Sequence, residues 1–275
     1  MAYDLHTHSA LSDGTQTVDE LVGEIAGTGL TGFALTDHDT CVGWTRAAEL
    51  ADVYGLDFVP GMEVSCATSG LSVHLLSYYH DPENTDLFAE INLARDSRIT
   101  RAQKMVDLIA VDYPVTWDLV QEHVGEEATV GRPHIADALV TAGCVSTRSE
   151  AFATILTPAS PYYVSHYAVD PVKAVKLVRA AGGVPVMAHP FARSRGRVAS
   201  VELLEQMIDA GLCGLEINHR DNAEDDRAVL RVLAQKHDLI VTGASDYHGA
   251  GKPNRLGENT TTGQMVERIR ERAGL

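Results

Sequence analysis

The sequence predicts an α/β fold, a closed barrel of seven parallel strands that carries an inserted helical subdomain. Two observations predict this fold class. Strand and helix patterns alternate over residues 1–80 and again over residues 164–275, and short loops join them, as in α/β barrels. Residues 81–163 show helical patterns alone, so we expect them to form an insertion that covers the mouth of the barrel.

The first part of the barrel begins with an apolar strand at residues 3–5 and a helix at residues 18–26. Thr17 and Glu20 have the spacing of a capping box, in which each side chain binds a free backbone N–H at the helix start. The same alternation continues with a strand at 32–36, a helix at 44–54 that Gly55 ends, and strands at 58–64 and 72–79.

The insertion is predicted to begin with one long helix at residues 87–109, because its apolar residues recur near every 3.6 positions. Thr116 precedes a second helix at 117–124, and Gly143 follows a third at 133–141. Thr147 and Glu150 repeat the capping-box spacing before a fourth helix at 151–156.

Strand–helix alternation returns at Asp170 and Pro171, an N-cap followed by proline at the first helical position. The helix that starts there ends at Gly182 and Gly183. The later elements are strands at 184–188, 214–217 and 239–242, helices at 201–210 and 223–236, and a final helix after Thr262.

Composition limits the class of protein. The chain has 275 residues, 45% of them apolar, which suits one large domain with an insertion. A formal net charge of −16 argues against a broad face for long nucleic acid. Neither a membrane-spanning apolar run nor a leader is visible, and the four cysteines form no C-x-x-C motif. We therefore expect a cytoplasmic protein without membrane contact; the sequence does not predict an oligomeric state.

Ionisable side chains gather at the predicted carboxyl ends of the strands. His6 and His8 lie two residues apart, so an extended backbone aims both imidazoles at one point, and Asp13 follows shortly. Further groups of this kind follow other strands: Asp37, His38, Asp39, Glu63, His74, His189, Asp246 and His248. Carboxyl ends of barrel strands form active sites, and imidazoles with carboxylates but no thiolate favour Zn, Fe or Mn. These residues predict a site for several metal ions.

A second set of residues suggests phosphate binding. Arg132 and His134 stand at the start of a helix in the insertion, where an arginine and free N–H groups attract anions. We expect Arg132 to bind phosphate and His134 to donate a proton to the leaving oxygen. Arg193 and Arg195 follow a predicted strand and are candidates for a second phosphate, and His219 is a candidate pocket residue.

Eight stretches of the chain resemble the PHP (polymerase and histidinol phosphatase) family, most closely its small-nucleotide phosphoesterases with a helical insertion. They are DLHTHSALSDG, LTDHDT, PGMEVS, VHLLSYYHDP, GRPHIADALV, AAGGVPVMAHP, GLEINH and GASDYHG. The resemblance implies a distorted seven-stranded (β/α) barrel with up to three divalent metal ions. It assigns His6, His8, Glu63 and Asp246 to one ion, Asp13, His38 and His248 to a second, and Glu63, His74 and His189 to a third.

We therefore expect a metal-dependent phosphoric monoester hydrolase in which a hydroxide bridging two ions attacks the phosphate, with His134 and Asp246 as catalytic residues. The expected substrate is a small nucleotide, such as a nucleoside 3′,5′-bisphosphate, AMP or a 5′-phosphorylated short oligonucleotide. Asp13 stands where many histidinol phosphatases have histidine, which favours nucleotides. Asn218–His219 departs from the pattern of similar proteins. The alternatives are a phosphatase of histidinol phosphate or a similar metabolite, a non-catalytic regulatory module, and, ranked lower, a metal-dependent deaminase or amidohydrolase.

Overall fold

A computed structural model describes residues 1–125 and 128–275; the two remaining residues fall within the predicted insertion. The described strands form one sheet in the order β7-β6-β5-β4-β3-β2-β1-β8. Their bounds are β1 Ala2–Thr7, β2 Gly32–Leu35, β3 Asp57–Thr68, β4 Leu71–Tyr78, β5 Val184–Met187, β6 Gly214–Asn218, β7 Ile240–Gly243 and β8 Thr261–Thr262. Tyr247, just after β7, bridges in parallel to Thr7 at the end of β1. The sheet is thereby nearly closed, which confirms the predicted barrel.

The fourth strand corrects one expectation. β4 runs antiparallel to both β3 and β5, whereas the sequence pattern predicted seven parallel strands. The reason is local: β3 and β4 are joined by a tight hairpin at Ser69 and Gly70, which have φ angles of 48° and 73°. A connection this short permits only antiparallel pairing, because a parallel pair needs a long crossover. A short extra strand, β8, pairs antiparallel with β1.

The helices around the barrel begin where capping residues predict. Thr17 and Glu20 form the complete capping box, and Asp170 accepts the N–H groups of Val172 and Lys173. These helices are α1 Val18–Ala26, α2 Trp44–Tyr54, α7 Pro171–Ala180, α8 Val201–Asp209, α9 Glu224–Lys236 and α10 Gly263–Ala273. One turn of 3₁₀-helix, η1 Arg193–Arg195, follows β5. Among the described residues, none of the helices combines the length and the apolar character that a membrane span requires.

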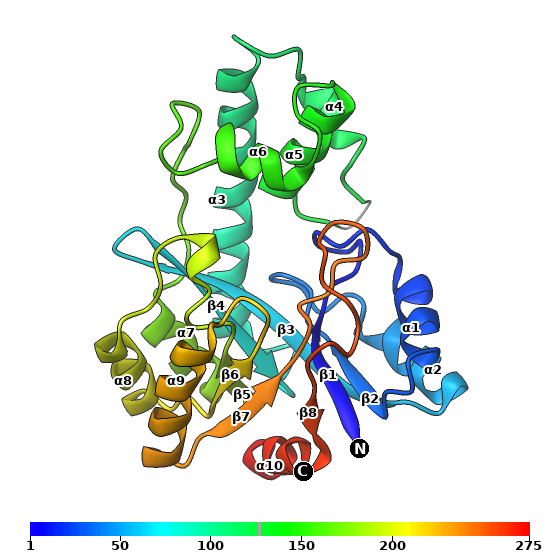
Figure 1. Cartoon of the computed structure of the whole chain (residues 1–275), viewed down its shortest axis with the longest axis vertical. Coiled ribbons are helices and arrows are strands. Elements are labelled where there is room, and N and C mark those ends of the chain that lie inside the picture. The colour runs from blue at the N-terminus through cyan, green and yellow to red at the C-terminus, as the bar shows by residue number, and fades with distance from the viewer. Residues whose placement is uncertain (126–127) are drawn as a thin grey trace.

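A second group of helices lies beyond one end of the barrel: α3 Thr85–Ile109, α4 Trp117–Gln121, α5 Arg132–Thr141 and α6 Arg148–Thr154. β1 runs from the N-terminus toward them, and α4, α5 and α6 lie together beside the upper part of α3 (Figure 1). Leu87 and Ile91 of α3 pack into the barrel core, while Met105 and Ile109 pack into a separate core shared with α5 and α6. The long helix therefore joins two cores at the end of the barrel where the parallel strands finish.

Candidate metal centre

The first predicted ligands lie on β1 and on the loop that follows it. His6 and His8 are fully buried. Asp37, at the end of β2, accepts hydrogen bonds from the backbone N–H of Ser9 (2.8 Å), the hydroxyl of Ser9 (2.7 Å) and the hydroxyl of Ser12 (2.5 Å). These three bonds fix the loop between the histidine pair and Asp13. Asp37 thus orients candidate ligands through the backbone that carries them.

One group of donors contains the four residues predicted for the first ion. His6 Nε2 and His8 Nε2 lie 3.1 Å and 3.0 Å from Glu63 Oε2. The same two nitrogens lie 3.5 Å and 3.4 Å from Asp246 Oδ1. One donor atom from each of the four residues lies within 4.8 Å of the others. All four side chains are buried, and the structure brings this predicted set together.

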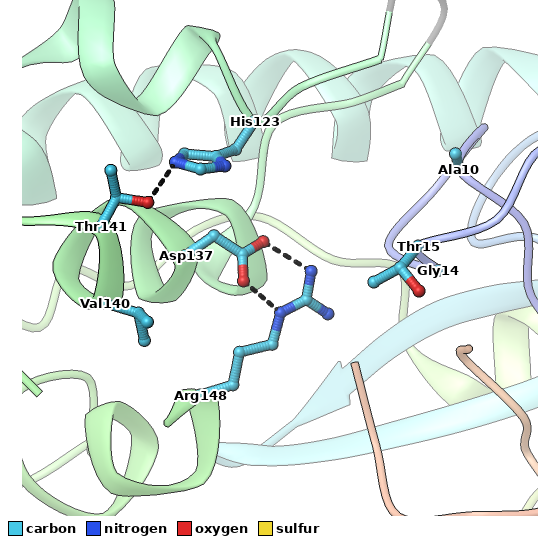
Figure 2. Close-up of a pocket in the computed structure, with 8 residues that line it drawn as sticks. All are labelled: Ala10, Gly14, Thr15, His123, Asp137, Val140, Thr141 and Arg148. Carbon is cyan, nitrogen blue, oxygen red and sulfur yellow. Dashed lines mark hydrogen bonds and ion pairs between the residues drawn. The ribbon is translucent and has the colours of Figure 1, made fainter. Parts of the chain in front are cut away.

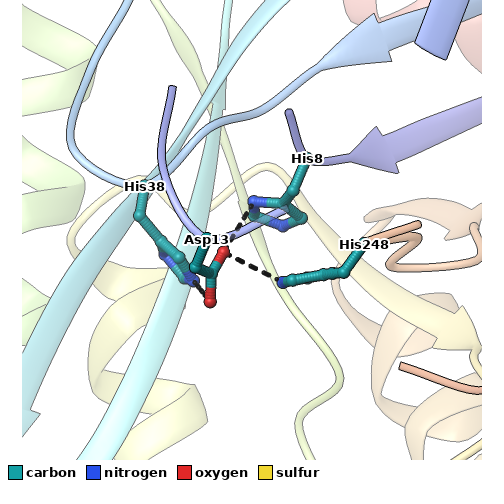
Figure 3. Close-up of side chains that lie close together, drawn as sticks. All are labelled: His8, Asp13, His38 and His248. Atoms are coloured by element: carbon teal, nitrogen blue, oxygen red, sulfur yellow. Dashed lines mark ion pairs between the residues drawn. The ribbon is translucent and has the colours of Figure 1, made fainter. Parts of the chain in front are cut away.

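A second group surrounds Asp13 (Figure 3). His248 Nε2 lies 3.1 Å from Asp13 Oδ1, and His38 Nε2 lies 3.8 Å from Asp13 Oδ2. His8 also belongs to this group, since its Nδ1 lies 3.8 Å from Asp13 Oδ1. The two nitrogens of the His8 ring therefore face two different groups, which spacing in the sequence does not show.

The third group differs from the predicted set. It contains His38, Glu63 and His74, with His74 Nδ1 only 2.6 Å from Glu63 Oε1. His189 stands at its edge: its Nε2 lies 3.6 Å from Glu63 Oε1 and 3.2 Å from Arg195 Nη1. The guanidinium of Arg195 thus contacts the same ring nitrogen of His189 that faces Glu63.

Buried atoms without partners show that these residues suit cations. Among the described residues, both ring nitrogens of His8, Oδ1 of Asp13, Nδ1 of His38 and Nε2 of His248 make no hydrogen bond. Buried polar atoms are nearly always paired, so this many unpaired atoms in one place requires an explanation. Divalent cations accept electron pairs from all of them, and the mixed nitrogen and oxygen donors fit Mn, Fe or Zn.

Protonation states also favour cations. Burial lowers the pKa of His38 to about 4 and the pKa of His248 to about 3, which keeps both rings neutral and able to coordinate. Although burial raises the pKa of Glu63, His38 and His6 hold it well below its ordinary range. His8 differs: burial lowers its pKa, but the nearby carboxylates of Asp246 and Glu63 raise it to about 9. An entering cation would therefore displace a proton from His8.

Glu216, a fully buried carboxylate on β6, is not among the residues predicted from the sequence. Its Oε1 lies 3.0 Å from His6 Nδ1, and its Oε2 accepts the backbone N–H of His189 at 2.8 Å. The first contact makes His6 Nδ1 the donor and leaves Nε2 free to coordinate. A charged residue inside the apolar strand Gly214–Asn218 is the sequence signal that could have found it.

Two cations neutralise Asp246. Arg195 Nη2 lies 2.6 Å and Lys252 Nζ lies 3.0 Å from Asp246 Oδ2. Although burial raises the pKa of Asp246, Lys252 and Arg195 hold it well below its ordinary range. Arg195 also pairs with Asp221 at 2.7 Å, whereas Arg193 is exposed and pairs with Asp226 at 2.7 Å. The structure therefore brings Arg195 into the centre and leaves Arg193 at the surface.

Two predicted histidines lie beside the centre. His219 is fully buried, and its Nε2 lies 3.7 Å from Asp246 Oδ2. His134 is also buried, and its Nδ1 accepts the backbone N–H of Gly131 at 3.0 Å. Burial lowers the pKa of His134, an effect that the nearby carboxylate of Asp13 partly opposes. His134 thus lies on α5, on the side of the centre that holds Asp13.

The insertion touches the loop of Asp13 along one wall of a cavity of about 360 Å³. Arg148 donates to the backbone carbonyl of Asp13 at 3.1 Å and forms a bidentate ion pair with Asp137 (Figure 2). The other lining residues are Ala10, Gly14, Thr15, His123, Val140 and Thr141. The cavity opens between the insertion and the barrel, next to the second group of candidate ligands.

A buried set of imidazoles and carboxylates at the mouth of an α/β barrel defines the class as a metal-dependent hydrolase. Comparison with known proteins agrees. Residues 4–130 match the PHP domain family. The chain is 33% identical over 253 residues to the 3′,5′-nucleoside bisphosphate phosphatase of Chromobacterium violaceum, covering 92% of this chain and 89% of that protein. It is 30% identical over 258 residues to a 5′-3′ exoribonuclease of Haemophilus influenzae, covering 94% and 93%.

A solved structure from Bifidobacterium adolescentis, described as a metal-dependent phosphoesterase, superposes with a TM-score of 0.96 and 43% identity. The match covers 98% of this chain and 96% of that one. The chain therefore belongs to the PHP family, and it is a hydrolase that acts on phosphate esters.

Proposed function

We propose that the protein hydrolyses the phosphomonoester of a small nucleotide, such as a nucleoside 3′,5′-bisphosphate, AMP or a 5′-phosphorylated short oligonucleotide. The observation that carries the proposal is the position of Glu63. Its Oε2 faces His6, His8 and His38 at 3.1, 3.0 and 3.4 Å, and its Oε1 faces His74 at 2.6 Å. One buried carboxylate thus links three groups of donors, an arrangement suited to the several charges of a phosphate.

The chain would hold three divalent ions, Mn, Fe or Zn, and the residues that would hold them are His6, His8, Asp13, His38, Glu63, His74, His189, Asp246 and His248. When bound, such ions lower the pKa of water and offset charge on the phosphoryl oxygens. The protein's own part is to fix the donors: Glu216 holds His6 in one tautomer, and Asp37 holds the loop of Asp13.

His134 is the proposed proton donor to the leaving oxygen. Because its Nδ1 accepts the N–H of Gly131, the proton of the neutral ring lies on Nε2. Burial lowers the pKa of this ring, so its protonated form transfers a proton readily. Asp246 is the second proposed catalytic residue. Lys252 and Arg195 keep its carboxylate ionised, so that it can orient the attacking water.

The insertion, residues 81–163, is proposed to cover the mouth and limit the substrate to small molecules. Arg148 binds the backbone of Asp13, and Arg98 on α3 binds the carboxylate of Asp39, beside His38. Both contacts support a position over the centre. All four cysteines are free, which is consistent with the cytoplasmic location that we also propose.

Phosphate release by the Mn²⁺-loaded enzyme from a panel of substrates tests the proposal. The panel contains AMP, adenosine 3′,5′-bisphosphate, a 5′-phosphorylated dinucleotide, a longer 5′-phosphorylated RNA and histidinol phosphate. We expect the highest kcat/KM on one of the small nucleotides. A preference for histidinol phosphate would overturn the substrate class, and a preference for the long RNA would overturn the role of the insertion. A metal-loaded enzyme that is inactive on all five would favour a regulatory module.

A further inference from the structure

The second group of candidate ligands depends on two loops that lie far apart in the sequence. Asp13 belongs to the loop between β1 and α1, and His248 belongs to the loop between β7 and β8. Their side chains meet at 3.1 Å, from Asp13 Oδ1 to His248 Nε2. Both loops are irregular, so the separation of these two donors depends on the contacts that hold the loops in place.

Thr15 joins the two loops within the barrel domain. Its backbone N–H and its hydroxyl donate to the carbonyl of His248 at 3.2 Å and 3.3 Å. The same hydroxyl accepts the backbone N–H of Ala250 at 2.9 Å. These bonds hold the loops next to each other. Their position relative to the insertion, which carries the proposed proton donor His134, requires a further contact.

Arg148, on α6 of the insertion, contacts both loops. Its Nη1 donates to the backbone carbonyl of Asp13 at 3.1 Å. The same nitrogen lies against Gly251, because a Cβ atom added to this glycine would stand only 2.4 Å from it. Gly251 in turn donates its backbone N–H to the carbonyl of His248 at 3.2 Å. Arg148 therefore reaches the backbone of one loop at the donor itself and that of the other loop three residues after the donor.

Asp137 fixes the direction of this guanidinium (Figure 2). Its two carboxylate oxygens accept from Nε and Nη2 of Arg148, which leaves Nη1 directed at the loops. The side chains of Arg148 and Asp137 are 15% and 22% exposed, so this bidentate pair is better shielded from water than a surface pair. Asp137 lies one turn after His134 on α5. A single guanidinium thus connects the helix of the proposed proton donor with both loops of the second group.

We propose that Arg148 is a positioning residue that completes the second ion site, by clamping the loops of Asp13 and His248 against the insertion. The proposal rests on the three-ion centre of the proposed function, and it gives the insertion a part in metal binding. Arg148 acts here by placing the donors, since a positive charge beside a cation site by itself opposes metal binding. Placement and charge therefore predict changes of opposite sign in metal affinity when the arginine is replaced.

Calorimetric titration of the chelator-stripped protein with Mn²⁺ tests the clamp without turnover. R148M removes the ion pair and the bond to the Asp13 carbonyl, so one of the three ions should bind about 10- to 100-fold more weakly, while the other two keep their wild-type Kd. If Arg148 acted only through its charge, that ion would instead bind more tightly. The control is R95M, which should keep all three Kd values, because Arg95 is also in the insertion but donates to Thr129 Oγ1 at 2.9 Å.

A substitution on the barrel side repeats the test and decides it if R148M does not fold. In G251A the new Cβ would stand 2.4 Å from Nη1, the end of a flexible side chain, so the guanidinium should move aside while its charge is kept. We expect G251A to weaken the same single ion. Unchanged or tighter Mn²⁺ binding in both variants, or an equal loss for all three ions, would overturn the clamp. A wild-type protein that binds three ions but hydrolyses no phosphomonoester would instead overturn the proposed function.

Discussion

At the scale of single residues, Glu216 shows how a group outside the ligand set prepares a metal centre. It fixes both the His6 ring and the backbone of His189, which come from different strands. Partners of this kind typically change metal affinity by about 10- to 100-fold. We expect E216Q to weaken Mn²⁺ binding by this factor while the fold is kept. Calorimetric titration with Mn²⁺ checks it, and wild-type affinity in E216Q would show that Glu216 only fills space.

His134 provides a second test at this scale. If it protonates the leaving oxygen, H134Q should lower kcat by at least about 100-fold, because general acids contribute at least this much. Metal content, measured by mass spectrometry, should stay at the wild-type level. His123 is the matched control, since its Nε2 contacts the hydroxyl of Thr141 at the neighbouring cavity. H134Q with the kcat of the wild type, or H123Q with an equal loss, would contradict the assignment.

Residue patterns predicted which side chains gather at the centre but not all of their contacts. Spacing along a strand shows that His6 and His8 share a direction. It cannot show that His8 faces two groups, or that Arg195 and Lys252 meet on Asp246, because these contacts join distant segments. Ionic partners of this kind become visible only once the barrel is closed.

At the scale of elements, capping residues predicted helix starts well because they act within one turn of the chain. Thr17 and Asp170 are examples. Strand direction was harder, since alternation of apolar residues is the same for parallel and antiparallel strands. For β4 the decisive signal was the short connection at Ser69 and Gly70, which leaves no room for a crossover.

The end of β4 also carries a pH-dependent contribution to stability. His80 packs against the ring of Trp44 at the start of α2, with its Nδ1 2.8 Å from Ser77 Oγ and its Nε2 3.2 Å from Cys41 Sγ. Burial lowers its pKa from 6.5 to about 4, although the charge of Asp81 opposes this. Between these two pKa values, His80 binds a proton in the unfolded chain but stays neutral in the folded chain. The contribution of neutral His80 to the free energy of unfolding is therefore fully present above pH 6.5 and is lost as the pH falls toward 4.

The corresponding experiment measures urea unfolding of the wild type and H80Q in EDTA at pH 7 and pH 5. The free energy of unfolding of the wild type should fall between these values by about 2 kcal/mol more than that of H80Q. H80Q can differ in stability at pH 7 without affecting the test, because only the change with pH is compared. An identical change in both proteins would contradict a buried neutral His80.

At the scale of the whole molecule, the long helix α3 connects the barrel core to the core of the insertion. It also carries Arg98, which binds the carboxylate of Asp39 next to His38, so one helix both joins the two parts and brings positive charge to the centre. The protein has a net charge of −16, yet positive charge gathers beside the centre. This distribution would attract a small phosphorylated molecule without making the whole surface attractive to long polyanions.

We propose that several divalent ions, held around Glu63, make the protein a phosphomonoesterase. The most direct test strips the protein with chelator and then titrates Mn²⁺ while both bound metal and phosphate release from adenosine 3′,5′-bisphosphate are measured. We predict no activity without metal and a rise that is complete only when about three ions are bound per chain. Full activity with one bound ion, or none with three, would contradict the claim.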